Sequence, residues 1–137
     1  LQVRFENYVK TVNVEGQLTA MMATRQILPA ALRWQGELAT SFTATRSALG
    51  DGVQVMVQHE QLKTLTATIT DFQKAIVVLE KSLAHPAEGD AEKHARHMRD
   101  GVLPAMSEVR KLGDKLETLV ADDLWPLPTY REMLFIK

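Results

Sequence analysis

The sequence predicts an all-α fold: an antiparallel bundle of three long helices, or four if the first one breaks, followed by an extended apolar tail. Apolar residues recur at alternating spacings of three and four through two long stretches, which is the period of packed amphipathic helices. The segments between the stretches are short, and short connections between such helices imply antiparallel neighbours. Near the C-terminus, Pro126 and Pro128 end the helical pattern and favour an extended backbone.

The first helix is expected over residues 4–49, although its apolar pattern is less regular and is interrupted at Glu15 and Gly16. At about 1.5 Å per residue it would be about 65 Å long, against about 40–45 Å for the other two. We therefore expect it to break, with Pro29 as an interior proline, or to project its N-terminal part beyond the bundle. Its expected core positions are Phe5, Tyr8, Val9, Val12, Leu18, Met21, Met22, Leu28, Leu32, Ala39 and Phe42.

The second helix is expected over residues 58–83, after a turn at 50–52 that contains two glycines. Three valines at positions 53, 55 and 57 alternate with polar residues in a strand-like way, but this segment is too short to form a sheet. The helix should end before Pro86, because the residue before a proline disfavours the α conformation. Its apolar seam is Leu62, Leu65, Ile69, Phe72, Ile76, Leu79 and Leu83.

The third helix is expected over residues 91–121, following a second turn at 84–90. Asp90 is placed to cap its first turn. Pro104 lies inside the pattern and should kink the helix near Gly101, but the seam stays in phase on both sides, which predicts one bent helix. That seam is Ala91, Ala95, Met98, Val102, Ala105, Val109, Leu112, Leu116 and Leu119.

Chain length and composition limit the number of domains, the partners and the compartment that we expect for this protein. A chain of 137 residues forms one domain, and its start at Leu1, inside an amphipathic pattern, suggests a domain excised from a longer protein. The net charge of −1 gives no electrostatic reason to expect nucleic acid as a partner. No apolar run is long enough to predict a membrane span. The absence of cysteine excludes disulfides and fits a reducing compartment, and we expect a cytoplasmic protein.

The chain has no evident catalytic, cofactor-binding or metal-binding residues. His94 and His97 lie three residues apart on the third helix, but Arg96 and Arg99 stand among them and would repel a cation. Glu117, Asp122 and Asp123 form an acidic group that could attract a metal ion, but acidic residues at a helix end are more often only solvent-exposed. No nucleophile elbow and no glycine-rich phosphate loop is present.

The segment 124–137, with the sequence LWPLPTYREMLFIK, is the most distinctive part of the chain. It carries too much apolar surface to lie free in water, and its prolines lower the entropy lost when it docks. We expect it to pack in extended form on its own bundle or on a neighbouring subunit. The residues expected to carry this docking are Trp125, Pro126, Pro128, Tyr130 and Phe135.

The tail resembles the C-terminus of type III glutamine synthetases, and the opening RFENYVKTVNVEGQLTAMMATRQILPAALRWQGELA resembles the helical region that follows their catalytic core. The resemblance implies a parent enzyme that joins ammonia to glutamate with ATP and Mg²⁺ or Mn²⁺, bound by residues upstream of this region. It also implies the upstream catalytic domain and neighbouring subunits of a homo-oligomer as partners, and a structural role in subunit packing. The alternative is an autonomous helical-bundle interaction or sensor module.

Overall fold

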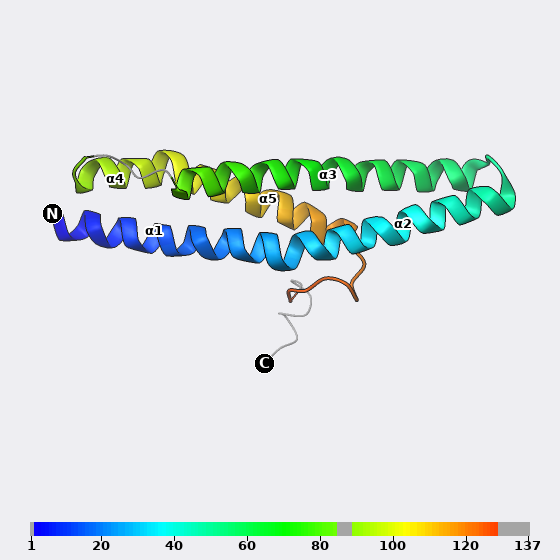
Figure 1. Cartoon of the computed structure of the whole chain (residues 1–137), viewed down its shortest axis with the longest axis horizontal. Coiled ribbons are helices and arrows are strands. Elements are labelled where there is room, and N and C mark those ends of the chain that lie inside the picture. Colours follow the sequence, from blue (N-terminus) through cyan, green and yellow to red (C-terminus); the bar gives the residue numbers. More distant parts are fainter. Residues whose placement is uncertain (1, 85–88, 129–137) are drawn as a thin grey trace.

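Three long helical rods lie along the long axis of the molecule, the first and third running in one direction and the second in the other (Figure 1). The computed structural model describes residues 2–84 and 89–128. Its elements are α1 (Gln2–Met22), the π-helical turn η1 (Ala23–Ile27), α2 (Leu28–Leu49), α3 (Val53–Ala84), α4 (Ala91–His97), the π-helical turn η2 (Met98–Val102) and α5 (Leu103–Leu119). No strand occurs in the described ranges, so the predicted all-α bundle is confirmed. None of these helices is both long enough and apolar enough to cross a membrane.

A π-helical turn precedes each interior proline. In η1 the Leu28 N–H bonds to the Ala23 carbonyl, five residues back, and in η2 the Leu103 N–H bonds to the Met98 carbonyl in the same way. Proline lacks an N–H and its ring clashes with the carbonyl four residues earlier, so a widened turn lets the helix continue past it. The first rod therefore bends without breaking, and the kink predicted near Gly101 is confirmed.

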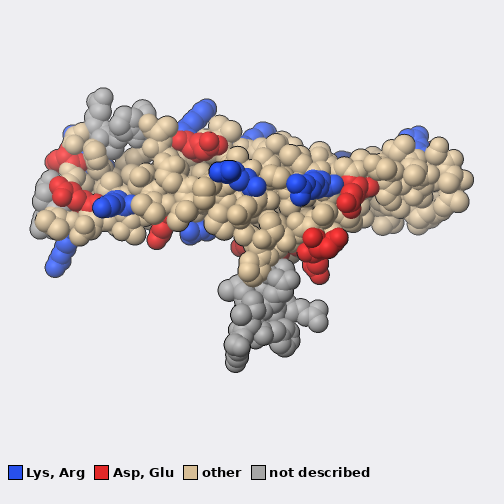
Figure 2. All heavy atoms as spheres, turned by 60° about the horizontal axis from the view of Figure 1, so that its bottom comes forward, with Lys and Arg blue, Asp and Glu red and all other residues tan. Residues whose placement is uncertain are grey.

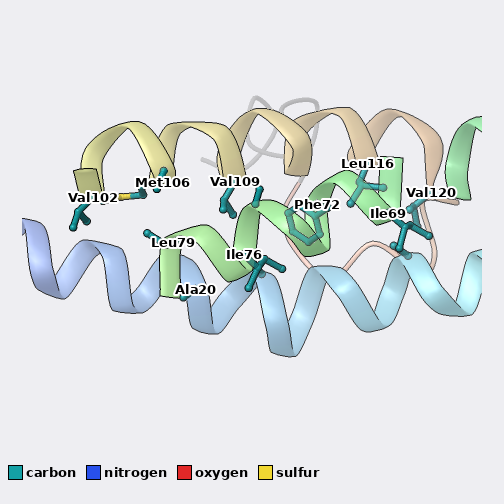
Figure 3. Packing of buried hydrophobic residues seen from close by; sticks show 14 of the residues in the cluster. Ala20, Ile69, Phe72, Ile76, Leu79, Val102, Met106, Val109, Leu116 and Val120 are labelled. Carbon is teal, nitrogen blue, oxygen red and sulfur yellow. The ribbon is translucent and has the colours of Figure 1, made fainter. Parts of the chain in front are cut away.

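The core is built from the predicted seams of the second and third rods. Ile69, Phe72, Ile76 and Leu79 of α3 face residues of η2 and α5 across the interior (Figure 3). Phe72, Leu79, Val102 and Leu116 have no exposed surface. The buried residues contributed by the third rod are Ala95, Met98, Val102, Ala105, Met106, Val109, Gly113 and Leu116. Asp90 caps α4 as predicted, because its carboxylate accepts a hydrogen bond from the Lys93 N–H at 3.0 Å.

Small residues form the buried face of the first rod, which corrects the core predicted for it. Leu18, Met21 and Leu32 were expected inside, but 48%, 45% and 42% of their surfaces are exposed. The residues that face the other rods are Val12, Gly16, Ala20, Ala23, Ala30 and Ala31. A Cβ on Gly16 would lie 2.8 Å from Leu83 Cδ2, so the rods approach more closely here than large side chains would allow.

The α2–α3 hairpin corrects two further expectations. α3 begins at Val53 instead of residue 58, so the alternating valines lie in a helix. The part of the first rod that projects beyond the bundle is its C-terminal end, not its N-terminal end. Figure 1 shows the end of α2 and the start of α3 extending together past α5. Gly50, with a φ of 75°, makes the connection, since this conformation favours glycine. We call residues 38–59 the hairpin arm.

Candidate functional site

The chain turns back on itself directly after α5. Val120 ends the helix in an extended conformation, with φ −86° and ψ 142°, while its N–H still bonds to the Leu116 carbonyl at 2.9 Å. The Leu124 N–H then donates to the Ala121 carbonyl at 3.0 Å, and the Trp125 N–H reaches the same carbonyl at 3.2 Å. This tight turn holds Leu124 and Trp125 against the end of the bundle.

The first residues of the expected docking tail lie partly on the bundle. Leu124 and Trp125 are half-buried and pack against the core cluster, whereas Pro126 and Pro128 are exposed and Leu127 is half-buried. In Figure 1 this segment leaves the bundle close to the junction of α1 and α2. The other two expected docking residues, Tyr130 and Phe135, lie outside the described residues, as does the rest of the tail from position 129 onward.

Two indole groups at the core boundary have no hydrogen-bond acceptor within residues 2–84 and 89–128. The Nε1 atoms of Trp34, on α2, and Trp125 are both buried, and neither finds an acceptor among the described residues. Both rings pack against the core cluster. Leaving a buried donor unpaired costs roughly 1–3 kcal/mol, and tryptophan N–H groups usually find a partner when buried. Sequence reasoning singled out Trp125 as a docking residue, but it had no means of detecting that either indole lacks an acceptor among the described residues.

The histidines considered as metal ligands are not arranged as a site. His97 Nε2 lies 2.8 Å from the Ser82 carbonyl, which can only accept, so this nitrogen carries the proton. His94 is half-buried beside a hollow of about 420 Å³ that Glu6 and Asp90 also line. Across residues 2–84 and 89–128, no three His, Cys, Asp or Glu side chains gather closely enough to hold a metal ion.

Arg4, Arg96 and Arg99 line a hollow of about 540 Å³ beside α1 and α4. Three arginines around one hollow are a possible binding site for an anion. Arg96 is already bonded to Glu92 at 2.6 Å, and Arg99 is bonded to Asp100 at 2.8 Å. The hydrogen bond with Asp100 raises the pKa of Arg99, and the same bond lowers the pKa of Asp100. These are exposed ion pairs, so the hollow does not present three free cations to a phosphate.

A second surface, which sequence reasoning missed, lies at the end of the hairpin arm. Its apolar side chains Leu49, Val53, Met56 and Val57 are between 62% and 76% exposed. One signal in the sequence could have identified it: residues 38–59 contain no lysine or glutamate, one arginine (Arg46) and one aspartate (Asp51).

Known proteins of similar sequence align with almost the whole length of the chain. The family described as "Glutamine synthetase C-terminal domain" matches residues 1–46, which cover α1, η1 and most of α2. The type-3 glutamine synthetase of Dictyostelium discoideum is 27% identical over 99% of the chain, and a glutamine synthetase of Bacteroides fragilis (strain YCH46) is 28% identical over 100%. A glutamine synthetase of Butyrivibrio fibrisolvens is 28% identical over 98% of the chain.

These alignments cover 19% of each relative, so the chain spans about a fifth of the length of the curated proteins that it matches. The resemblance predicted from the two ends of the sequence is therefore confirmed: the chain is similar throughout to glutamine synthetases, and residues 1–46 match the model of their C-terminal domain.

Proposed function

We propose that this chain is the assembly domain of a glutamate–ammonia ligase. In this proposal ATP and Mg²⁺ or Mn²⁺ bind to the catalytic region of a longer parent protein, and the helical bundle contributes no catalytic group. The names of the relatives and their greater length support the proposal, as does the lack of a metal-binding group in the described ranges. The bundle would hold the catalytic domain and neighbouring subunits in place, in a homo-oligomer located in the cytoplasm.

The tail is the part of the chain that we propose for docking in this assembly. The observation that carries the proposal is the change in burial along it: Trp125 packs on the core cluster, and the next residue, Pro126, is exposed. The turn at residues 121–125 fixes the start of the tail, so less entropy is lost when the remaining residues dock. Tyr130 and Phe135 would supply large apolar rings to the bundle or to an adjacent subunit.

Two truncations of the parent protein separate docking from folding. Removing residues 124–137 also removes Leu124 and Trp125 from the core boundary, so this variant should lose stability whether or not the tail docks. Removing only residues 129–137 leaves both side chains in place. We expect the shorter truncation to shift the oligomer to smaller species in sedimentation velocity, with little change in circular dichroism. An unchanged mass and an unchanged Tm after this truncation would refute the docking role.

A further inference from the structure

Two aspartate–glycine pairs occur in the chain, and the structure gives them different backbones. Asp51 and Gly52 belong to the turn that joins α2 to α3, at the free tip of the hairpin arm (Figure 1). Asp100 and Gly101 lie inside the π-helical turn η2. The two aspartate side chains are similarly accessible, since 76% and 64% of their surfaces are exposed. Any difference in their chemistry therefore follows from the backbone and not from exposure to water.

The first pair is held loosely. The Gly52 carbonyl accepts from the N–H groups of Val55 and Met56 at 3.1 Å each, but the Gly52 N–H donates to no backbone carbonyl in the described chain. The carboxylate of Asp51 makes one exposed ion pair, with Arg46 Nε at 3.0 Å, and such pairs restrain side chains weakly. The arm has no lysine and no second arginine to hold this carboxylate. Figure 2 shows the projecting end almost free of charged residues on the face displayed.

The second pair is held by a helix. Gly101 lies within η2 (Met98–Val102), where backbone hydrogen bonds fix the chain around Asp100. A Cβ on Gly101 would lie 3.3 Å from His97 Cε1, so an imidazole ring also covers this glycine. For an aspartate carboxyl to bond to the amide of the next residue, that amide must turn away from its helical orientation and lose its hydrogen bond. Gly52 is free to do so, because it has no such bond and glycine adopts a wide range of conformations.

We propose that Asp51 is a site of spontaneous isomerisation to isoaspartate in the folded protein, and that Asp100 is protected from this reaction. The Gly52 nitrogen bonds to Cγ of the protonated Asp51 carboxyl group, whose hydroxyl leaves as water together with the amide proton. The product is a five-membered succinimide. Water then adds to the main-chain carbonyl carbon of residue 51 and breaks its bond to the Gly52 nitrogen. The chain afterwards runs through Cβ and Cγ of residue 51, and its mass is unchanged.

Isomerisation changes the tip of the hairpin arm and leaves the core intact. The connection is short: the Gly50 N–H donates to the Arg46 carbonyl at 2.8 Å, and Gly50 has a φ of 75°. One added carbon atom in the main chain alters this turn, so the hydrogen bond at the end of α2 should weaken. The buried cluster begins on α3 at Leu65, about 20 Å along the helix from the turn. The helical content and the Tm should therefore change little.

Peptide mapping of the 137-residue chain tests the proposal, because trypsin separates the two sites. Cleavage after lysine and arginine releases residues 47–63 with Asp51 and residues 100–110 with Asp100. After long incubation in neutral buffer, chromatography with mass spectrometry should resolve peptide 47–63 into two species of equal mass. An isoaspartate-specific carboxyl methyltransferase should label the new species with a methyl group from S-adenosylmethionine. Isomerisation should be at least several-fold faster at Asp51 than at Asp100, and equal or slower isomerisation at Asp51 would overturn the proposal.

Two controls separate the effect of the fold from that of the local sequence. In urea both sites should isomerise at similar rates, because unfolding removes the helix that protects Asp100. A difference of the same size in urea would show that the flanking residues cause it, and would refute the structural argument. Asp51→Glu should abolish the new species, since ring closure would then need a six-membered ring. If it persisted in this variant, Asp51 would not be the reacting residue. The tail takes no part in the reaction, so this test and the truncation test fail independently.

Discussion

Three glycine-to-alanine substitutions test how closely the first rod packs on the others. All three glycines lie inside helices, at positions 16, 36 and 113, but their surroundings differ. A Cβ on Gly36 would meet nothing within 4 Å, whereas one on Gly113 would lie 3.6 Å from Ile27 Cδ1. A Cβ on Gly16 would lie 2.8 Å from Leu83 Cδ2 and 3.3 Å from Val102 Cγ1.

The magnitudes follow from these distances. Replacing glycine by alanine in a helix interior stabilises by about 0.8–1.0 kcal/mol, which is the change expected for Gly36→Ala. Gly113→Ala adds a methyl group at van der Waals distance, and burying it contributes about 0.8 kcal/mol more. Gly16→Ala overpacks the contact at a cost of about 1–3 kcal/mol, so its net effect lies between neutral and about 2 kcal/mol destabilising.

Urea unfolding followed by circular dichroism at 222 nm measures the differences. The expected order of stability is Gly113→Ala, then Gly36→Ala, then Gly16→Ala, with the first and last separated by about 2–4 kcal/mol. Gly36→Ala is the internal control, because it reports helix propensity without packing. If Gly16→Ala proved as stable as Gly36→Ala, the close approach of α1 to Leu83 and Val102 would be refuted, and with it the buried face assigned to the first rod.

Five further substitutions, at four positions, probe the core and its boundary. Phe72→Ala should destabilise by about 3–5 kcal/mol, since the side chain is fully buried; a loss below 1 kcal/mol in urea unfolding would contradict this. Trp125→Phe should cost far less than Trp125→Ala, because it keeps much of the ring area and removes a donor that has no acceptor in the described part of the chain; equal losses of Tm would argue against that. His97→Ala should lower stability by about 0.5–1.5 kcal/mol through the lost hydrogen bond to the Ser82 carbonyl, and His94→Ala should lower it by less. Adding zinc should not change the Tm of either variant. A Tm that rises with zinc would reveal a metal site.

The second and third rods could be predicted from the sequence because large apolar residues recur at helical spacing along their buried faces. Leu65, Ile69, Phe72 and Leu79 recur at helical spacing, and all of them are buried. The interior proline Pro104 also predicted a local distortion of the third rod, and the structure has a π turn directly before it, at Met98–Val102.

The first rod could not be predicted in the same way. Its large apolar residues occur on two faces, and the face that packs is the one with Gly16, Ala20 and Ala23. Small residues contribute little to a hydrophobic pattern, but they permit a close approach between helices, which only the three-dimensional arrangement reveals. The arm surface escaped notice for a related reason: Val53 and Val57 alternate as a strand would, and their helical conformation follows from the continuation of α3.

The most direct test of the proposed function compares the parent protein with this chain alone. ATP binding by calorimetry and glutamate-dependent, ammonia-dependent ATP consumption should be measured for both, in the presence of Mg²⁺. The proposal predicts binding and glutamine formation by the parent protein, and neither by the 137-residue chain. Micromolar ATP binding by the chain, or a parent protein without ligase activity, would contradict it.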